Sequence, residues 1–460
     1  MWSEMRAEPA IPTAIMDMCH RFRNAFSLAA AAMLVVVTAS SFQSQARQNT
    51  PARPAAAPGA TTYTGAGSCN ASNCHGSVWP KTGGKIKQNE YNLWSSKDKH
   101  TKAYSVLLEP RSKMIARNLK IDKPETAAQC LDCHATNAPT AQQATSFQIS
   151  DGVGCESCHG PAGGWLGPHV THDWTHEQSV KLGMVDTKDV RKRTEVCLSC
   201  HLGTDKKTVD HELIAAGHPA LIFELETFSA LLPSHWRKVN EKVDTLHRWA
   251  QAQPIGLRES MGQLQRVSAK AGDGWVDFGE LECMSCHHAL VLPSARQERG
   301  YSGHTGLPPW NEARYVVLKH LMTAVSPTAE KELETRVAEL KRSLESPVKD
   351  RAATNAAAQA IVNLTNQASP TIEKAALDQA FANGMLRSIT GDATNIAWAG
   401  MRAAEQATMS VDVLYNAIHP NRPEDQVNAQ IGKLYEMLQS QALYNPEEFA
   451  AALKRLGSSF

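Results

Sequence analysis

The pentapeptide Cys155-Glu156-Ser157-Cys158-His159 determines the fold class expected for this chain, because it combines two cysteines and a histidine at fixed spacing. The same C-x-x-C-H spacing recurs three more times, and a fifth copy that begins at Cys69 has four residues between its cysteines. The cysteines of the five copies are Cys69, Cys74, Cys130, Cys133, Cys155, Cys158, Cys197, Cys200, Cys283 and Cys286, and their histidines are His75, His134, His159, His201 and His287.

In a C-x-x-C-H signature both thiols bind the haem vinyl groups as thioethers, and the adjacent histidine becomes an axial ligand of the iron. Zinc ribbons, redox-active loops and disulfides are competing explanations for any single cysteine pair. A zinc site does not require a histidine directly after the second cysteine, whereas all five pairs have one. We therefore predict five covalently bound c-type haems. For Cys69 and Cys74 the longer loop keeps a disulfide or a zinc site open as alternatives.

The remaining cysteine, Cys19, precedes an apolar run over 25–39 that follows Arg21 and Arg23. This order is typical of an export signal, here with a cleavage site near Ala46. The run is shorter than the ~20 residues that span a bilayer, and no later segment is apolar enough to do so. We expect a signal peptide over 1–46 and a periplasmic mature chain without a transmembrane segment, unless an uncleaved signal serves as a tether.

Basic and acidic residues nearly cancel, with 47 Lys plus Arg against 46 Asp plus Glu. Five ferric haems with two propionates each would bring the net charge to about −4. This balance favours a redox partner with a cationic patch and argues against nucleic acid. The lysines within 97–123 and 181–207 can still form a local positive face.

The composition divides the rest of the chain into three parts. Residues 47–67 are rich in Pro, Ala, Thr and Gly, which predicts a flexible linker. Residues 68–308 hold all five motifs, and helical patches over 91–108, 210–232 and 235–252 take the place of alternating strands. The fold class expected is mainly α, with a pentahaem cytochrome domain that has little regular sheet and an α-helical bundle over 309–460.

The expected bundle lacks cysteine and shows helical periodicity. Leu333, Val337, Leu340 and Leu344 form one apolar stripe. Helix starts are predicted at Ser326-Pro327, Ser369-Pro370 and Asn445-Pro446, with Glu448 placed to reach back to Asn445. The pattern predicts about six or seven helices packed as a bundle.

A low-spin electron carrier needs a second axial ligand on most irons, so histidines near the motifs are candidate distal ligands. The candidates are His100, His169, His211, His218 and His288, with His172, His176 and His304 as weaker alternatives. A propionate or backbone partner is the alternative role for His288. His235, His247 and His320 fall on expected amphipathic helices, where a surface or hydrogen-bonded histidine is common, and His419 is expected at a helix end.

The order of these elements resembles the cytochrome c-554 family, tetrahaem periplasmic carriers that take electrons from hydroxylamine oxidoreductase. The resemblance rests on the first motif, on Trp94 with His100-Thr101-Lys102-Ala103, on the second motif, on 152–161 with His169 beyond it, and on the fourth motif. It implies that His100 and His169 are distal ligands and that the haem on His134 lacks one. The longer first motif, the missing histidine shortly before Cys197, the fifth motif and the bundle depart from the family. His211 or His218 can substitute for the missing ligand.

The function expected is an exported multihaem c-type cytochrome that transfers electrons between redox partners through closely packed, mostly bis-histidine haems. The alternative is an oxidoreductase that acts on a small nitrogen compound, hydroxylamine or nitric oxide, at a five-coordinate haem on His134. Pentahaem nitrite reductases carry lysine at their catalytic haem, and all five motifs here end in histidine, which argues against that class. A third possibility is a subunit of a larger complex in which the bundle is a docking module.

Overall fold

The computed structural model describes residues 61–84, 86–237, 244–270, 276–288, 306–346, 350–419 and 425–460. Helices are the regular structure of these ranges, together with two isolated β-bridges, Tyr63–Gln143 and Leu281–Trp310. This confirms the mainly α fold class. All described residues belong to one unit, 55–460. No helix within the described ranges is both long and apolar enough to cross a membrane.

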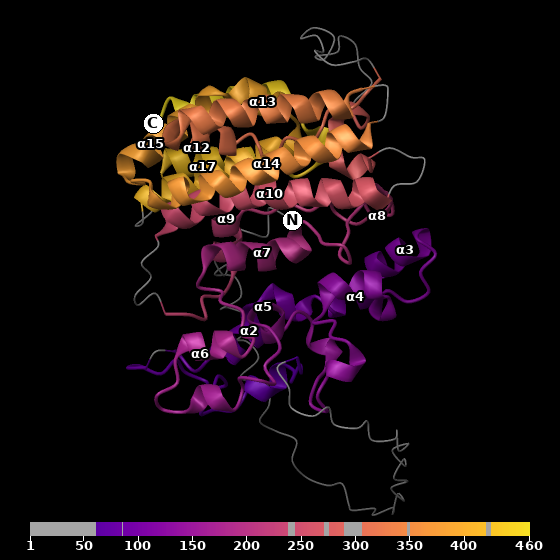
Figure 1. Cartoon of the computed structure of the whole chain (residues 1–460), viewed down its shortest axis with the longest axis vertical. Coiled ribbons are helices and arrows are strands. Elements are labelled where there is room, and N and C mark those ends of the chain that lie inside the picture. The colour runs from indigo at the N-terminus through magenta and orange to yellow at the C-terminus, as the bar shows by residue number, and fades with distance from the viewer. Residues whose placement is uncertain are drawn as a thin grey trace, which may run out of the picture. The chain divides into compact units, whose positions relative to one another are not determined.

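The N-terminal part is built from short helices joined by long loops (Figure 1). They are α2 (Glu90–Lys97), α3 (Pro110–Asn118), α4 (Ala128–His134), α5 (Cys155–His159), α6 (His176–Lys181), α7 (Val190–His201), α8 (His211–Ala215) and α9 (Leu225–Leu231). Their apolar contacts are small, such as the cluster of Leu107, Leu131 and Ala135. Such a segment buries little side-chain surface of its own, as expected for a region organised around cofactors.

Two of the helices predicted here are interrupted. The stretch 91–108 forms α2 and two 3-10 turns, because Asp98 ends α2 and accepts a hydrogen bond from the backbone of His100 at 2.9 Å. The stretch 210–232 is divided into α8 and α9 at Gly217, whose φ of 115° lies in the left-handed region that favours glycine. Both interruptions fall beside a candidate histidine.

Residues 61–67, which fall in the expected linker, pack against the third motif. The carboxylate of Glu156 accepts backbone hydrogen bonds from Thr64 at 2.8 Å, Gly65 at 2.7 Å and Ala162 at 2.7 Å. Glu156 is only 4% exposed. A buried carboxylate with three N–H donors is well compensated, so this residue ties the chain segment to α5.

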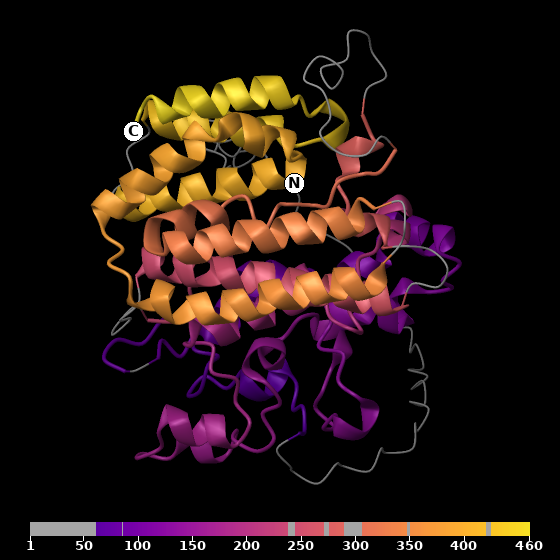
Figure 2. The same ribbon diagram turned by 45° about the horizontal axis from the view of Figure 1, so that its top comes forward.

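The C-terminal part is a set of longer helices that begins before the fifth motif. It contains α10 (Thr245–Lys270), α12 (Leu318–Val325), α13 (Pro327–Leu344), α14 (Arg351–Lys374), α15 (Gln379–Gly391), α16 (Ala393–Trp398), α17 (Met401–Ile418), α18 (Gln426–Met437) and α19 (Pro446–Gly457). α10 packs along α14, and α13 packs on the other side of α14 (Figures 1 and 2). The predicted helix over 235–252 starts only at Thr245, and residues 235–237 are not helical.

Several predicted features of the bundle are confirmed. Leu333, Val337, Leu340 and Leu344 are all buried on one side of α13. α19 starts after Asn445, whose side-chain oxygen accepts from the backbone of Glu447 and Glu448 at 3.0 and 3.4 Å. The carboxylate of Glu448 reaches back to the Asn445 side-chain amide at 3.1 Å.

The start predicted at Ser369-Pro370 is wrong, whereas that at Ser326-Pro327 coincides with the start of α13. α14 continues through Pro370 to Lys374, with Ala368 and Ile372 buried on its packed face. Ser369 turns its hydroxyl back to the carbonyl of Thr365 at 2.8 Å instead of capping a new helix. Tertiary packing outweighs the local preference of proline here.

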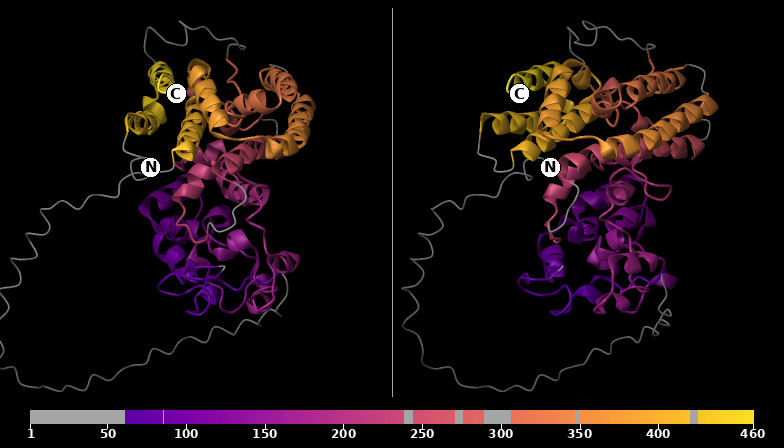
Figure 3. Two further views of the ribbon diagram at one scale, coloured as in Figure 1. Left: turned by 90° about the vertical axis from the view of Figure 1, so that its left-hand side faces the viewer. Right: turned by 60° about the vertical axis from the view of Figure 1, so that its left-hand side comes forward.

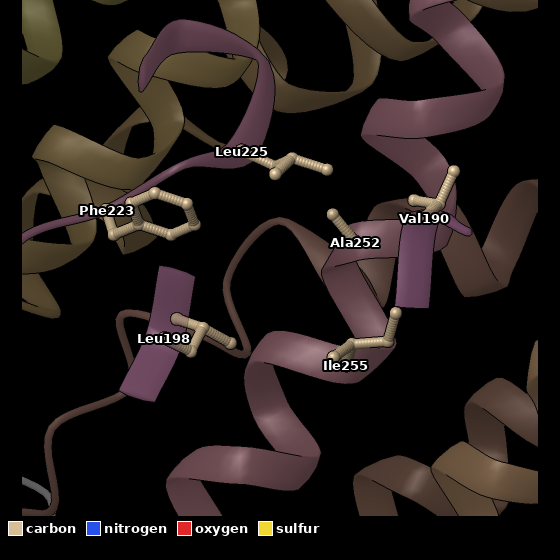
Figure 4. Close-up of a cluster of buried hydrophobic side chains, with 6 residues drawn as sticks. All are labelled: Val190, Leu198, Phe223, Leu225, Ala252 and Ile255. Carbon is tan, nitrogen blue, oxygen red and sulfur yellow. The ribbon is translucent and has the colours of Figure 1, made fainter. Parts of the chain in front are cut away.

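α7, which carries the fourth motif, packs on α10 through an apolar cluster (Figure 4). Its buried members are Val190, Leu198, Phe223, Leu225, Ala252 and Ile255. Arg258 of α10 adds an ion pair to Glu195 of α7 at 2.7 Å. The motif-bearing helix is therefore fixed to the longest helix of the C-terminal part, and Figure 3 shows the two parts side by side.

Candidate functional site

Three of the five motif histidines are the last residue of an α-helix: His134 of α4, His159 of α5 and His201 of α7. In a helix the two cysteines and the histidine of C-x-x-C-H lie at positions i, i+3 and i+4, which share one face. The three anchoring atoms therefore point the same way from one helical turn. The fifth motif differs from these three, because it begins with a 3-10 turn, η11 (Cys283–Ser285), instead of an α-helix.

The longer first motif folds back on itself. The backbone N–H of His75 donates to the carbonyl of Cys69 at 3.2 Å, which returns the histidine to the first cysteine. A Cβ atom at Gly76 would lie 1.7 Å from the carbonyl oxygen of Asn70, so the closed loop requires glycine there. Cys69 and Cys74 form no disulfide, and neither do the other eight described cysteines.

Each motif histidine faces one histidine from outside the motifs. The distances between ring centroids are 6.3 Å for His75–His169, 6.4 Å for His100–His201, 6.3 Å for His134–His218, 6.4 Å for His159–His235 and 6.4 Å for His211–His287. The planes of the paired rings range from nearly parallel, 5° for His75–His169, to nearly perpendicular, 89° for His134–His218.

This spacing fits two imidazoles on opposite sides of one metal ion. A histidine nitrogen lies about 2.0 Å from a bound metal and about 1.2 Å from the centre of its own ring, so two trans imidazoles have centroids about 6.4 Å apart. Direct ring contacts would span a wider range, from about 4.5 to 7 Å. The five pairs have nearly the same centroid distance, whereas the angles between their ring planes differ. This combination indicates a gap of the same size in each pair, wide enough for a metal ion, in which each ring can take its own rotation about the line between the two rings.

Hydrogen bonds hold six of the ten paired rings in the orientation that a metal ligand needs. Their Nδ1 atoms donate to carboxylates or carbonyl oxygens: Glu90 for His75 (3.0 Å), Asp98 for His100 (2.9 Å), Ala103 for His134 (2.9 Å), Leu166 for His169 (2.5 Å), Pro219 for His218 (2.8 Å) and Pro233 for His235 (3.3 Å). An imidazole whose Nδ1 carries the proton has its Nε2 lone pair available for a metal. The residues present therefore fit a haem iron held from both sides.

The surroundings of the paired rings differ in charge. The hydrogen bond to Glu90 raises the pKa of His75, and the one to Asp98 raises the pKa of His100. Burial instead lowers the pKa of His159 and of His201 to about 4, which keeps both rings neutral. Neutral imidazole is the metal-binding form.

Contacts between cysteines of different motifs show which motifs are neighbours. Cys69 of the first motif lies beside Cys155 of the third, and Cys133 of the second lies beside Cys200 of the fourth. The Nζ of Lys207 also donates to the sulfur of Cys200 at 3.0 Å. Cys158 of the third motif lies near Cys197 and Cys200 of the fourth. These contacts give the order first, third, fourth and second for the cysteines of these four motifs, and porphyrins bound at the thiols would follow the same order.

The fifth motif is connected to the second by one short segment. His211 opens α8 and faces His287, and seven residues later His218 faces His134. The backbone N–H of His211 donates to Asp277 at 2.9 Å, which fixes α8 to the turn before the fifth motif. The fifth pair therefore extends the series beyond the second.

Four of the five candidate distal histidines, His100, His169, His211 and His218, lie opposite a motif histidine. Because every motif histidine already has such a partner, the partly buried His288 is not required as an iron ligand. The position of His218 also weighs against the five-coordinate iron that the resemblance implies for His134. His304 lies outside the described residues.

The remaining described histidines have other partners. His172 contacts Asp173, His176 contacts Asp186, His247 contacts Asp244, and His320 contacts Ser388 and Asp392. His419 directly follows α17 and contacts the Tyr415 carbonyl, as expected for a helix end.

His235 is the functional candidate that sequence reasoning missed. It was expected on an amphipathic helix as a surface or hydrogen-bonded histidine, but it lies in a non-helical segment whose Pro233 carbonyl accepts from its ring. Pro233 in Leu232-Pro233-Ser234-His235-Trp236 was the available signal, because proline argues against a helix interior.

Comparisons with known proteins agree with this site over part of the chain. Residues 68–160 match the family described as Cytochrome c554 and c-prime. The chain is 30% identical over 115 residues to Cytochrome c-554 of Nitrosomonas europaea, an alignment that covers 22% of this chain and 48% of that protein. No solved structure matches. The matches support a relation of the N-terminal part to multihaem c-type cytochromes, with covalently bound c-type haem and redox partners.

Proposed function

We propose that this protein is a periplasmic pentahaem cytochrome that carries electrons between redox partners, with every iron held between a motif histidine and a second histidine. The observation that carries the proposal is the set of five histidine pairs at one spacing. A c-type haem supplies a one-electron iron couple when it is bound. Two fixed imidazoles change little when the iron changes its charge, which suits transfer more than catalysis.

The residues suggest a linear path. The cysteine contacts order the motifs as first, third, fourth and second, and the segment from His211 to His218 adds the fifth. Two of the inner motif histidines are shielded enough that burial lowers the pKa of His159 and of His201 to about 4. His287 of the fifth motif is exposed. We infer that electrons enter or leave at the first and fifth motifs and pass through the three between them.

The alternative is catalysis on hydroxylamine or nitric oxide at a five-coordinate haem on His134. His218 disfavours it, because its ring is at ligand spacing from His134 and its Nδ1 is engaged with the Pro219 carbonyl. A small molecule would have to displace this histidine. The bundle then serves as the support of the fourth motif through α7 and α10 rather than as a second active site.

The test is a count of haems and of their spin states in the purified mature protein. We expect five haems per chain by intact mass and by the pyridine haemochrome assay, an N-terminus after about residue 46, and an electron paramagnetic resonance spectrum without a high-spin ferric signal. Zinc in place of haem at any motif, or a stoichiometric high-spin signal, would contradict the corresponding part of the proposal.

A further inference from the structure

The loop after the first motif exposes large apolar side chains. In this loop, the Trp79 loop (residues 77–84 and 86–87), Val78 is 75% exposed, Trp79 is 78% exposed and Ile86 is 42% exposed. Val170, the residue after His169, is 66% exposed. Apolar side chains are thus exposed close in sequence to both members of the first histidine pair. Contiguous exposed apolar surface marks interaction sites more often than isolated residues do.

The loop is held firmly at its base by the residue that also binds His75. One carboxylate oxygen of Glu90 accepts from the backbone of Lys87 at 2.8 Å and of Gln88 at 3.0 Å, and the other accepts from the His75 ring at 3.0 Å. The backbone of Lys81 also donates to the Lys87 carbonyl at 2.8 Å. An ordered base lets Trp79 be presented with little loss of entropy on binding.

A second set of contacts joins the loop to the third histidine pair. The Arg237 guanidinium donates to the carbonyls of Lys81 and Ile86, and the Lys87 ammonium donates to the carbonyl of Ser234 at 2.6 Å. Ser234 and Arg237 flank His235, which faces His159. The loop is therefore attached to ligand-bearing segments of the first and the third motif.

The charge of this region is positive. The sequence over 76–89 contains three lysines and no acidic residue, and Lys81 is exposed beside Trp79. Arg237 adds a further cation, while Glu90, the first acidic residue after the loop in the sequence, is engaged with His75. The net charge of the whole chain with five haems favoured a partner with a cationic patch. At short range, however, the positive charge of the loop orients an approaching protein, because salt screens charges beyond about 8–10 Å.

We propose that the Trp79 loop is the docking surface for an acidic electron-transfer protein that exchanges electrons with the haem of the first motif. This inference rests on the proposed function, since it requires a haem on His75. An exposed aromatic residue gives affinity, and cations on the same loop give a fast, salt-dependent encounter with an acidic protein.

The test uses the haem-loaded full protein and, as a probe, an acidic plant-type [2Fe–2S] ferredoxin that is reduced before mixing. Each encounter moves one electron from the reduced cluster to a ferric haem. We expect the second-order rate constant in stopped flow to fall as salt rises. Trp79→Ser should lower this rate constant about five- to tenfold at low salt and leave its salt dependence unchanged. Lys81→Glu should lower both the rate constant and its salt dependence.

The matched controls are Leu443→Ser and Lys454→Glu on the bundle. Leu443 is 82% exposed and Lys454 is exposed, so these changes repeat the lost apolar area and the reversed charge elsewhere. The controls should leave the ferredoxin rate within about twofold of the parent. Reduction by dithionite, which needs no docking, should be the same in all five proteins.

The result that overturns the proposal is an unchanged ferredoxin rate in Trp79→Ser and Lys81→Glu, or an equal loss in the two bundle variants. Haem content and spin state are measured on the same samples. Full haem content with insensitive rates rejects the docking surface alone, whereas a parent protein without a haem on His75 rejects the proposed function as well.

Discussion

Replacing His218 by alanine tests the assignment of ligands most directly. The His218 ring is 6.3 Å from His134, and the other four motif histidines have their own partners. The substitution should therefore free one coordination position among five. About one-fifth of the ferric iron should become high-spin, and one nitric oxide should bind per chain, against none in the parent.

The assay is electron paramagnetic resonance of the oxidised protein together with a nitric oxide titration followed in the visible spectrum. His176→Ala is the matched control, because His176 is also a partly buried histidine of the N-terminal part but contacts Asp186 at 2.9 Å. It should leave all irons low-spin. The reasoning is refuted if the parent already has one high-spin haem that binds nitric oxide and His218→Ala changes neither number.

Three further predictions concern stability, each measured by denaturant unfolding of the haem-loaded protein. Glu156→Gln should cost about 2–4 kcal/mol, because one neutral amide oxygen replaces a carboxylate that accepts three buried N–H bonds; a loss below the error of the fit would count against it. Leu340→Ala, in the buried stripe of α13, should cost about 2–5 kcal/mol, and Leu443→Ala, at an exposed site, less than about 0.5 kcal/mol. Burial alone would raise the pKa of Asp392, but hydrogen bonds from His320, Lys319 and Asn395 outweigh it and hold that pKa well below its usual value. The stabilisation is then present above about pH 4 and is lost as the pH falls further, so Asp392→Asn should destabilise the protein at pH 7 and flatten its acid dependence below pH 4; an equal pH dependence in both proteins would contradict the assignment.

Some functional residues could be predicted because their information is local. The four C-x-x-C-H motifs and the longer first motif each predict their own cysteines and histidine, because these three residues stand close together in the sequence. Helix caps and stripes are local too, which is why Asn445 and the Leu340 stripe were predicted correctly. The helix start predicted at Pro370 was wrong, because the packing of Ala368 and Ile372 on α14 outweighs the local effect of the proline.

The sequence by itself determined the helical class, and it predicted where haem would be attached and four of the five histidines that face a motif histidine. Only the tertiary structure decided which of them meet, because each pair joins residues more than 70 positions apart and no local rule selects among many such contacts. His235 faces His159, and the neighbouring Ser234 is held by the Trp79 loop through its carbonyl. The order of the motifs in space likewise arises from packing, which places Cys69 beside Cys155 and Cys133 beside Cys200.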